Sequence, residues 1–130
     1  MSHICKNLLI RCMDFRLRGE LTDWINESGL FEGGFDVISI AGASKSLADG
    51  SGEIKDFFLQ QVSVSTDLHH AEKVIVLHHS DCGAYGKDYT FSSKEDEKAK
   101  QIEDMKKTKE ILKETCMKPF GRDRPDKIIL

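Results

Sequence analysis

The sequence predicts an α/β fold in three layers, with a central, mostly parallel sheet of about four to five strands flanked by helices. Short apolar runs rich in branched residues alternate with segments whose apolar residues recur at helical spacing. The predicted strands are apolar almost throughout, which is typical of strands buried on both faces. No internal repeat or linker-like stretch divides the 130 residues, so we expect a single domain over 1–130.

The first half of the chain predicts a strand, a helix and a second strand. Residues 7–13 (NLLIRCM) are the first apolar run. The segment 16–28 follows, and its apolar residues fall on one helix face: Leu17, Leu21, Trp24 and Ile25. Gly29 is a typical helix stop. Residues 36–40 (DVISI) predict the second strand, and a loop of small residues over 41–44 follows it.

The second half repeats this alternation. A helix is expected from about 53 to 70, and the fully apolar run after the lysine in 73–77 (KVIVL) predicts the third strand. From 94 to about 116 the chain predicts a charged helix whose many Lys and Glu residues indicate a solvated face. Its apolar stripe is narrow: Ile102, Met105, Leu112 and Cys116. Residues 127–130 (KIIL) predict a last strand.

The composition indicates an ordinary globular protein and argues against several classes of partner. There are 19 Lys+Arg and 22 Asp+Glu, a formal net charge of −3, so the chain lacks the basic surface that a nucleic-acid partner requires. No apolar run approaches the ~20 residues of a membrane helix, and the first residues do not resemble an export signal. We therefore expect a cytoplasmic protein with neither a nucleic-acid nor a membrane partner.

Three potential metal ligands follow the ends of two predicted strands. Cys12 ends the first strand, and His79 and Cys82 follow the third. In parallel sheets, sites form beyond the carboxyl ends of the strands, so neighbouring strands would bring these side chains together. Two thiolates and an imidazole suit Zn²⁺, and three protein ligands leave a position open for water or substrate. A single cysteine at a strand end is more often a buried apolar residue, which is how we interpret Cys5 and Cys116.

Three segments resemble, in order, the signature segments of the β-class carbonic anhydrases. They are 12–16 (CMDFR), 41–43 (AGA) and 79–83 (HSDCG), and the resemblance covers roughly 7–86. It identifies the chain as a short, minimal member of that family. It implies about one Zn²⁺ per chain held by Cys12, His79 and Cys82, and a homodimer or higher homo-oligomer with sites near subunit interfaces.

The resemblance also implies a lyase activity, the reversible hydration of CO₂ to bicarbonate by zinc-bound hydroxide. In the family role, Arg16 holds Asp14 ionised and away from the metal, and Asp14 accepts a hydrogen bond from the hydroxide. If that pair breaks, Asp14 becomes a possible fourth ligand. Alternatively, Asp14 caps a helix that begins near Arg16, and Arg16 is a surface cation. Gly42, Ala43 and Gly83 would line the substrate pocket with backbone, the two glycines allowing close approach.

Other functions stay open. Residues 39–43 read SIAGA where the family typically reads Arg-Asn-Ala-Gly-Asn, so one alternative is a catalytically weak or inactive zinc-binding homologue. Another is a zinc hydrolase of a related small substrate such as carbonyl sulfide. A lower-ranked alternative is a metal-free, sulfurtransferase-like thiolate enzyme, with Cys82 and Lys87 at the ends of a loop. A nucleotide-binding module is disfavoured because neither glycine-rich phosphate motif is present.

Overall fold

The computed structural model describes residues 3–114 and 127–129. Strands and helices alternate along them, as the sequence predicts. In chain order the elements are β1 (Asn7–Cys12), the 3-10 turn η1 (Phe15–Leu17), α1 (Arg18–Ser28), β2 (Phe35–Ile40), α2 (Lys45–Asp49), α3 (Gly52–Ser63), the π-helical turn η2 (Val64–Leu68), β3 (Lys73–Leu77), α4 (Gly83–Asp88), α5 (Lys94–Leu112) and β4 (Lys127–Ile129).

The strands β1, β2 and β3 form a parallel sheet with β1 at its centre. β2 and β3 pair with β1 on opposite sides, and the three-residue β4 lies parallel to β3, which gives the order β2-β1-β3-β4. The α/β class and the parallel sheet are confirmed. A count of four to five strands is not supported: within the described residues, β1, β2 and β3 have five or six residues each and β4 has three.

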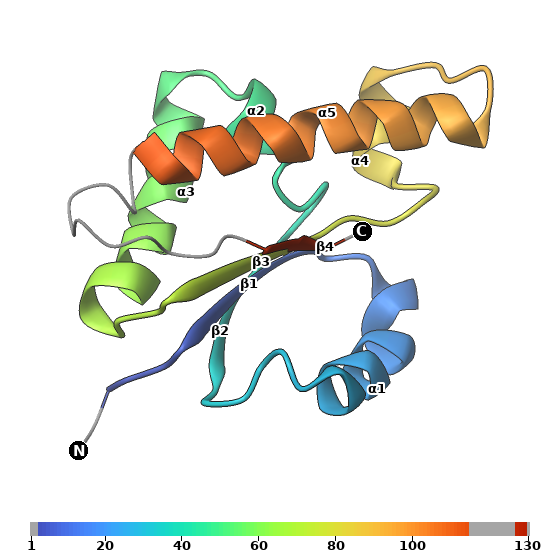
Figure 1. Cartoon of the computed structure of the whole chain (residues 1–130). Coiled ribbons are helices and arrows are strands. Elements are labelled where there is room, and N and C mark those ends of the chain that lie inside the picture. The colour runs from blue at the N-terminus through green and yellow to red at the C-terminus, as the bar shows by residue number, and fades with distance from the viewer. Residues whose placement is uncertain (1–2, 115–126, 130) are drawn as a thin grey trace.

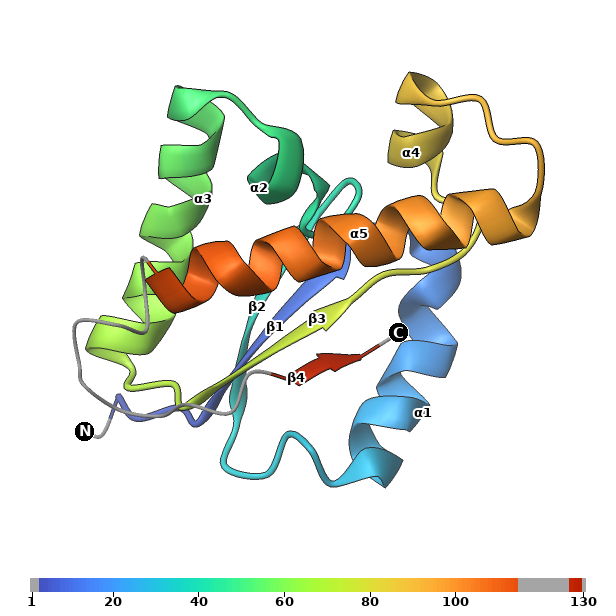
Figure 2. The same cartoon turned by 45° about the horizontal axis from the view of Figure 1, so that its top comes forward.

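Helices cover both faces of the sheet (Figures 1 and 2). α1 lies against one face, and α2, α3, α4 and α5 lie over the other. Because side chains alternate along a strand, Leu8, Ile10 and Cys12 of β1 face the larger core beneath the four helices, whereas Leu9 faces α1. The side chain of Cys12 is therefore the last on the face of β1 that packs into the main core.

Three helical segments differ from the sequence-based expectation. α2 and α4 were not predicted, since helices of five and six residues are too short for an apolar periodicity to emerge. The helix expected to reach residue 70 is α-helical only to Ser63 and continues as the π-helical turn η2. Its last part is rich in Ser and β-branched residues, which are weak helix formers.

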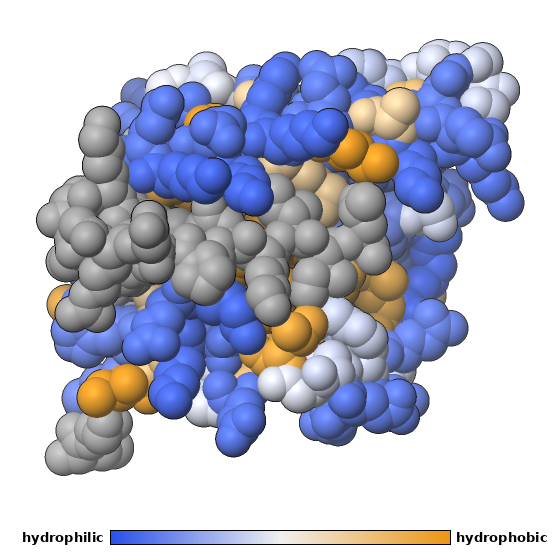
Figure 3. All heavy atoms as spheres, in the orientation of Figure 1, coloured by the Kyte–Doolittle hydropathy of each residue, from blue (hydrophilic) through white to orange (hydrophobic). Residues whose placement is uncertain are grey.

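α5 packs on the core through a face that is partly polar. Its buried residues are Gln101, Asp104, Met105, Thr108 and Leu112. The predicted apolar stripe is therefore wrong at Ile102, which is only half-buried, and Cys116 lies outside the described residues. The expected solvated face is confirmed by the exposed Lys and Glu residues, and Figure 3 shows mainly hydrophilic side chains over α5. No helix within the described ranges is long and apolar enough to span a membrane.

A buried hydrogen bond joins α4 to the polar face of α5. The Tyr85 hydroxyl, fully buried, donates to Oδ2 of Asp104 over 2.8 Å. Burial raises the pKa of Tyr85 far above its ordinary value, so the hydroxyl keeps its proton. Tyr85→Phe leaves the buried carboxylate without this donor, and we expect it to lower the free energy of unfolding by about 1–3 kcal/mol in urea titrations.

Tyr89→Phe is the matched control for this prediction. Tyr89 is half-buried and stacks on Tyr85 with ring centroids 6.2 Å apart, and the substitution keeps that contact. We expect its effect on unfolding to be a few tenths of a kcal/mol. If both variants lost the same free energy of unfolding, the hydrogen bond from Tyr85 to Asp104 would make no specific contribution to stability.

Candidate metal centre

The candidate site lies at the carboxyl end of the sheet, where β1 and β3 end side by side. β1 ends at Cys12, and Arg11 is in register with Leu77, the last residue of β3. The segment 78–82 therefore begins beside Cys12, although the two are far apart in the sequence. The expectation that these two strands are neighbours is confirmed.

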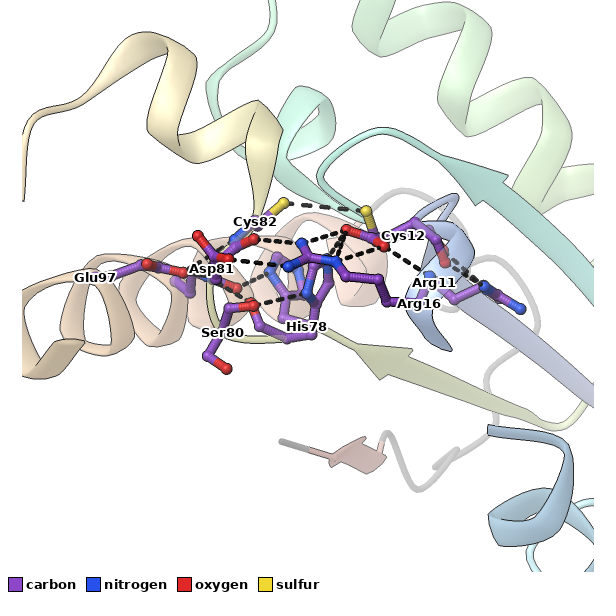
Figure 4. A network of polar contacts seen from close by, with 11 residues as sticks. Arg11, Cys12, Arg16, His78, Ser80, Asp81, Cys82 and Glu97 are labelled. Carbon is purple, nitrogen blue, oxygen red and sulfur yellow. Dashed lines mark hydrogen bonds and ion pairs between the residues drawn. The ribbon is translucent and has the colours of Figure 1, made fainter. Parts of the chain in front are cut away.

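Cys12, His79 and Cys82 bring three ligand atoms together. These atoms all lie within 4.8 Å of one another. The two sulfur atoms are 4.0 Å apart (Figure 4), and both thiols are free and buried. Two sulfurs bound tetrahedrally to one ion at about 2.3 Å would be about 3.8 Å apart. The group could therefore hold a metal ion with little movement of its sulfurs.

The imidazole of His79 presents an unused nitrogen to this group. Its Nδ1 lies 2.8 Å from the carbonyl oxygen of Ser80, which can only accept a hydrogen bond, so Nδ1 carries the proton. Nε2 is then a lone-pair donor. It is buried and has no hydrogen-bond partner among the described residues. A buried nitrogen without a partner is costly in an apolar site, and a cation at this position would satisfy it.

The surroundings of Cys82 also fit a cation. Burial raises the pKa of the Cys82 thiol, the backbone N–H groups of Tyr85 and Ala84 lower it in part, and the nearby Cys12 raises it further. Two adjacent buried thiolates are therefore unfavourable without a compensating positive charge. A divalent cation supplies that charge, and the set of two sulfurs and one imidazole nitrogen matches soft to borderline metals.

Asp14 is held beside the three potential ligands by Arg16. Its Oδ1 accepts from the backbone N–H of Arg16 at 2.8 Å, and its Oδ2 accepts from Nη2 of the guanidinium at 2.6 Å. These bonds hold the pKa of Asp14 well below its usual range and raise that of Arg16. Asp14 thus caps the turn η1 and pairs with Arg16 at once. Asp14 Oδ2 is 3.8 Å from Nε2 of His79 and lies outside the group of three.

Arg16 also contacts the segment 78–82, which carries the potential ligands His79 and Cys82. Its Nη2 donates to the carbonyl oxygen of Asp81 at 2.7 Å, and its Nη1 pairs with Oδ2 of Asp81 at 2.9 Å. Figure 4 shows the guanidinium reaching across to Asp81. Arg16 therefore joins the loop after β1 to the loop after β3, a link that the sequence did not reveal.

The loop after β2 packs closely on α4. Gly42 has φ +80°, and a Cβ there would lie 2.9 Å from Cβ of Lys45 and 3.1 Å from Cβ of Ala84. Glycine is thus required at this turn. Ala43 is buried with φ 53°. An added Cβ at Gly83 would have no described neighbour within 4 Å apart from adjoining residues. The pocket roles of all three residues stay predictions.

The sequence reasoning missed two residues that contact the ligand segment. Gln101 donates from Nε2 to the carbonyl oxygen of His79 at 2.9 Å, and Glu97 accepts from the backbone N–H of Cys82 at 3.2 Å. Both belong to α5, which the charge pattern indicated to be solvated. One signal for Gln101 was available in the sequence. Gln101 lies four residues before Met105, so the two residues share one helix face, and that face is the one that packs on the core.

Comparison with known proteins gives two similar sequences. One is an uncharacterized protein of Rickettsia bellii (strain RML369-C), 35% identical over 111 residues, which cover 82% of this chain and 67% of that protein. The other is an uncharacterized protein of Rickettsia conorii (strain ATCC VR-613 / Malish 7), 32% identical over 112 residues, or 82% of this chain and 59% of that protein. The chain thus spans about three fifths to two thirds of the length of these relatives.

A protein-family model matches residues 2–119, a range that contains all three potential ligands as well as Asp14 and Arg16. The match covers most of the 130 residues. The chain therefore belongs to this family, which is described as "Putative carbonic anhydrase".

Proposed function

We propose that the chain is a zinc-dependent lyase of the β-class carbonic anhydrase type, which interconverts CO₂ and bicarbonate. One observation carries this proposal. Cys12, His79 and Cys82 bring one ligand atom each within 4.8 Å of one another, Nε2 of His79 is buried without a hydrogen-bond partner among the described residues, and the carboxylate of Asp14, held by Arg16, lies 3.8 Å from it. Membership of the family supports the same conclusion. As part of this proposal, the chain forms a homodimer or larger homo-oligomer.

Zinc is the metal that this donor set suits best. We assign Cys12, His79 and Cys82 as the ligands of about one ion per chain. Structural zinc sites usually have four protein ligands and catalytic sites have three, so a set of three indicates a catalytic site. When bound, zinc supplies a Lewis acid that lowers the pKa of water enough to make a nucleophile available near neutral pH. The bond from Nδ1 of His79 to the Ser80 carbonyl fixes the tautomer that this coordination needs.

Asp14 and Arg16 then orient the attacking water. The reaction joins a water oxygen to the carbon of CO₂ and releases one proton, which gives bicarbonate. Because Arg16 holds the pKa of Asp14 far below neutrality, Asp14 is a poor base and a permanent hydrogen-bond acceptor. Its Oδ2 can therefore accept a hydrogen bond from the water and turn an oxygen lone pair toward the substrate carbon.

A cavity beside His79 gives a small substrate room. It has a volume of about 430 Å³ and is lined by residues 78–80 and the first turns of α5. Its charged lining residues are two lysines, Lys94 and Lys98, and two glutamates, Glu95 and Glu97, so charges of both signs face the cavity. A cavity of this volume is within the range of small-molecule sites, so it has room for CO₂ or bicarbonate.

A metal-free thiolate enzyme fits the site less well. Nucleophilic cysteines have lowered pKa values and are accessible to their substrates. The thiol of Cys82 has a raised pKa and belongs to a residue that is only 4% exposed. The main causes of that shift are burial, the backbone N–H groups of Tyr85 and Ala84, and Cys12, and not Lys87, the cation that this alternative would use.

Rapid-mixing assays of CO₂ hydration test the proposed function. Zinc-loaded protein should accelerate hydration above the buffer rate, treatment with a strong chelator should return the rate to background, and added Zn²⁺ should restore it. Zinc content is measured on the same samples. Bound zinc together with a background rate would overturn the activity, and a chain that binds no zinc would overturn the site as well.

A further inference from the structure

We infer that Glu97 and Gln101 of α5 are positioning residues that hold the segment 78–82, and with it two of the three metal ligands, in place. This inference rests on the proposed zinc site. Neither residue is one of the three ligands. Each acts through backbone atoms of the segment, so the expected effect is on how well the ligands are arranged.

Gln101 contacts two consecutive residues of the segment. Its side chain is buried, with the residue only 4% exposed. Nε2 donates to the carbonyl oxygen of His79 at 2.9 Å, while Oε1 lies 3.1 Å from Nδ1 of His78. Nε2 of His78 is in turn 2.8 Å from the hydroxyl oxygen of Ser44. One amide therefore fixes the backbone at a ligand and links it to the loop after β2.

Glu97 contacts the other ligand of the segment. Its Oε1 accepts from the backbone N–H of Cys82 at 3.2 Å and from Nε2 of Gln101 at 2.9 Å. Figure 4 shows Glu97 extending from α5 toward Cys82. Because Glu97 and Gln101 are one helical turn apart, a single rigid helix carries both contacts. The spacing between the backbones of His79 and Cys82 is thereby set from outside the segment.

The segment needs such support because its own conformation is unfavourable. Residues 78–82 lie outside the helices and strands, and Asp81 has φ 55°, a left-handed conformation that a non-glycine residue rarely adopts. Arg16 binds Asp81 from the side of β1, and Glu97 and Gln101 bind from the side of α5. The ligand segment is thus held between two sets of polar contacts.

Zinc affinity in Glu97 variants tests the inference. We expect Glu97→Ala to weaken zinc binding about tenfold to a hundredfold, as measured by competition with a chromogenic chelator. Glu97→Gln removes the same charge but retains a carbonyl oxygen, so it should restore most of the affinity. Glu110→Ala, at an exposed position of the same helix, is the matched control and should bind zinc like the wild type. Cobalt substitution gives a second readout, in which a displaced ligand alters the visible spectrum.

Gln101→Glu provides a second arm. It keeps an acceptor for His78, removes the donor to the His79 carbonyl and places a second carboxylate against Glu97. We expect a loss of zinc affinity at least as large as in Glu97→Ala, whereas Gln60→Glu on the exposed face of α3 should cause none. If Gln101→Glu does not fold, as judged by circular dichroism, the Glu97 series decides alone.

The outcomes separate this inference from the proposed function. A wild type that binds no zinc overturns the proposed function itself. A wild type that binds zinc, with Glu97→Ala binding within twofold of it, overturns only the positioning role. Equal losses in Glu97→Ala and Glu97→Gln would also overturn it, because they would show that the charge and not the bond to Cys82 matters.

Discussion

Cys82→Ser protein is expected to contain almost no zinc after purification, where the wild type contains about one ion per chain. The substitution removes one of three protein ligands and replaces a thiolate with a hydroxyl, which is a much weaker zinc ligand. Cys12→Ser should have the same result, since its sulfur lies 4.0 Å from that of Cys82. Elemental analysis of protein purified without added metal measures the effect. The melting temperature should also lose its response to added Zn²⁺.

Cys5→Ser is the control for this expectation. Cys5 is a half-buried free thiol whose Sγ donates to the carbonyl of Asn7 at 3.4 Å, and it is outside the metal group. The variant should retain the zinc content of the wild type. If Cys82→Ser kept its zinc, or if Cys5→Ser lost it, the assignment of the ligands would be wrong.

Arg16→Ala is expected to lower the rate of CO₂ hydration about tenfold to a hundredfold when it is assayed at saturating Zn²⁺. The substitution removes the guanidinium that engages Asp14 and the bonds that join the loop after β1 to Asp81. Asp14 then loses its fixed orientation as an acceptor. Rapid-mixing kinetics and zinc content should be measured on the same preparation, so that a loss of activity is not confused with a loss of metal.

Two further arginine variants sharpen this test. Arg16→Lys keeps the charge but cannot form the forked contacts to Asp14 and Asp81 together, so its rate should fall between those of the wild type and Arg16→Ala. Arg18→Ala, at the exposed start of α1, should leave the rate unchanged. A wild-type rate in Arg16→Ala would contradict the role assigned to the pair.

The parallel sheet could be predicted from the sequence because its strands are short, mainly apolar runs between helical patterns. The 73–77 run is the clearest case, and it coincides with β3. The short helices α2 and α4 could not be predicted in the same way, because neither is long enough to show a periodic apolar face. Nor could the polar part of the buried face of α5, where Asp104 accepts a hydrogen bond from Tyr85.

The candidate ligands could be predicted because the carboxyl ends of parallel strands share an edge, which brings Cys12 beside the segment after β3. The surrounding contacts could not. Glu97 and Gln101 lie in a helix whose composition indicates solvent exposure, and only tertiary packing shows which turn faces the ligand segment. The link from Arg16 to Asp81 depends likewise on a loop conformation that the sequence does not specify.

X-ray absorption at the zinc edge tests the central claim, that Cys12, His79 and Cys82 hold zinc, most directly. The wild-type spectrum should show two sulfur neighbours at about 2.3 Å together with nitrogen or oxygen neighbours at about 2.0–2.1 Å. Any zinc that Cys82→Ser retains after loading should show one sulfur fewer. A wild-type spectrum without sulfur, or one unchanged in Cys82→Ser, would contradict the claim.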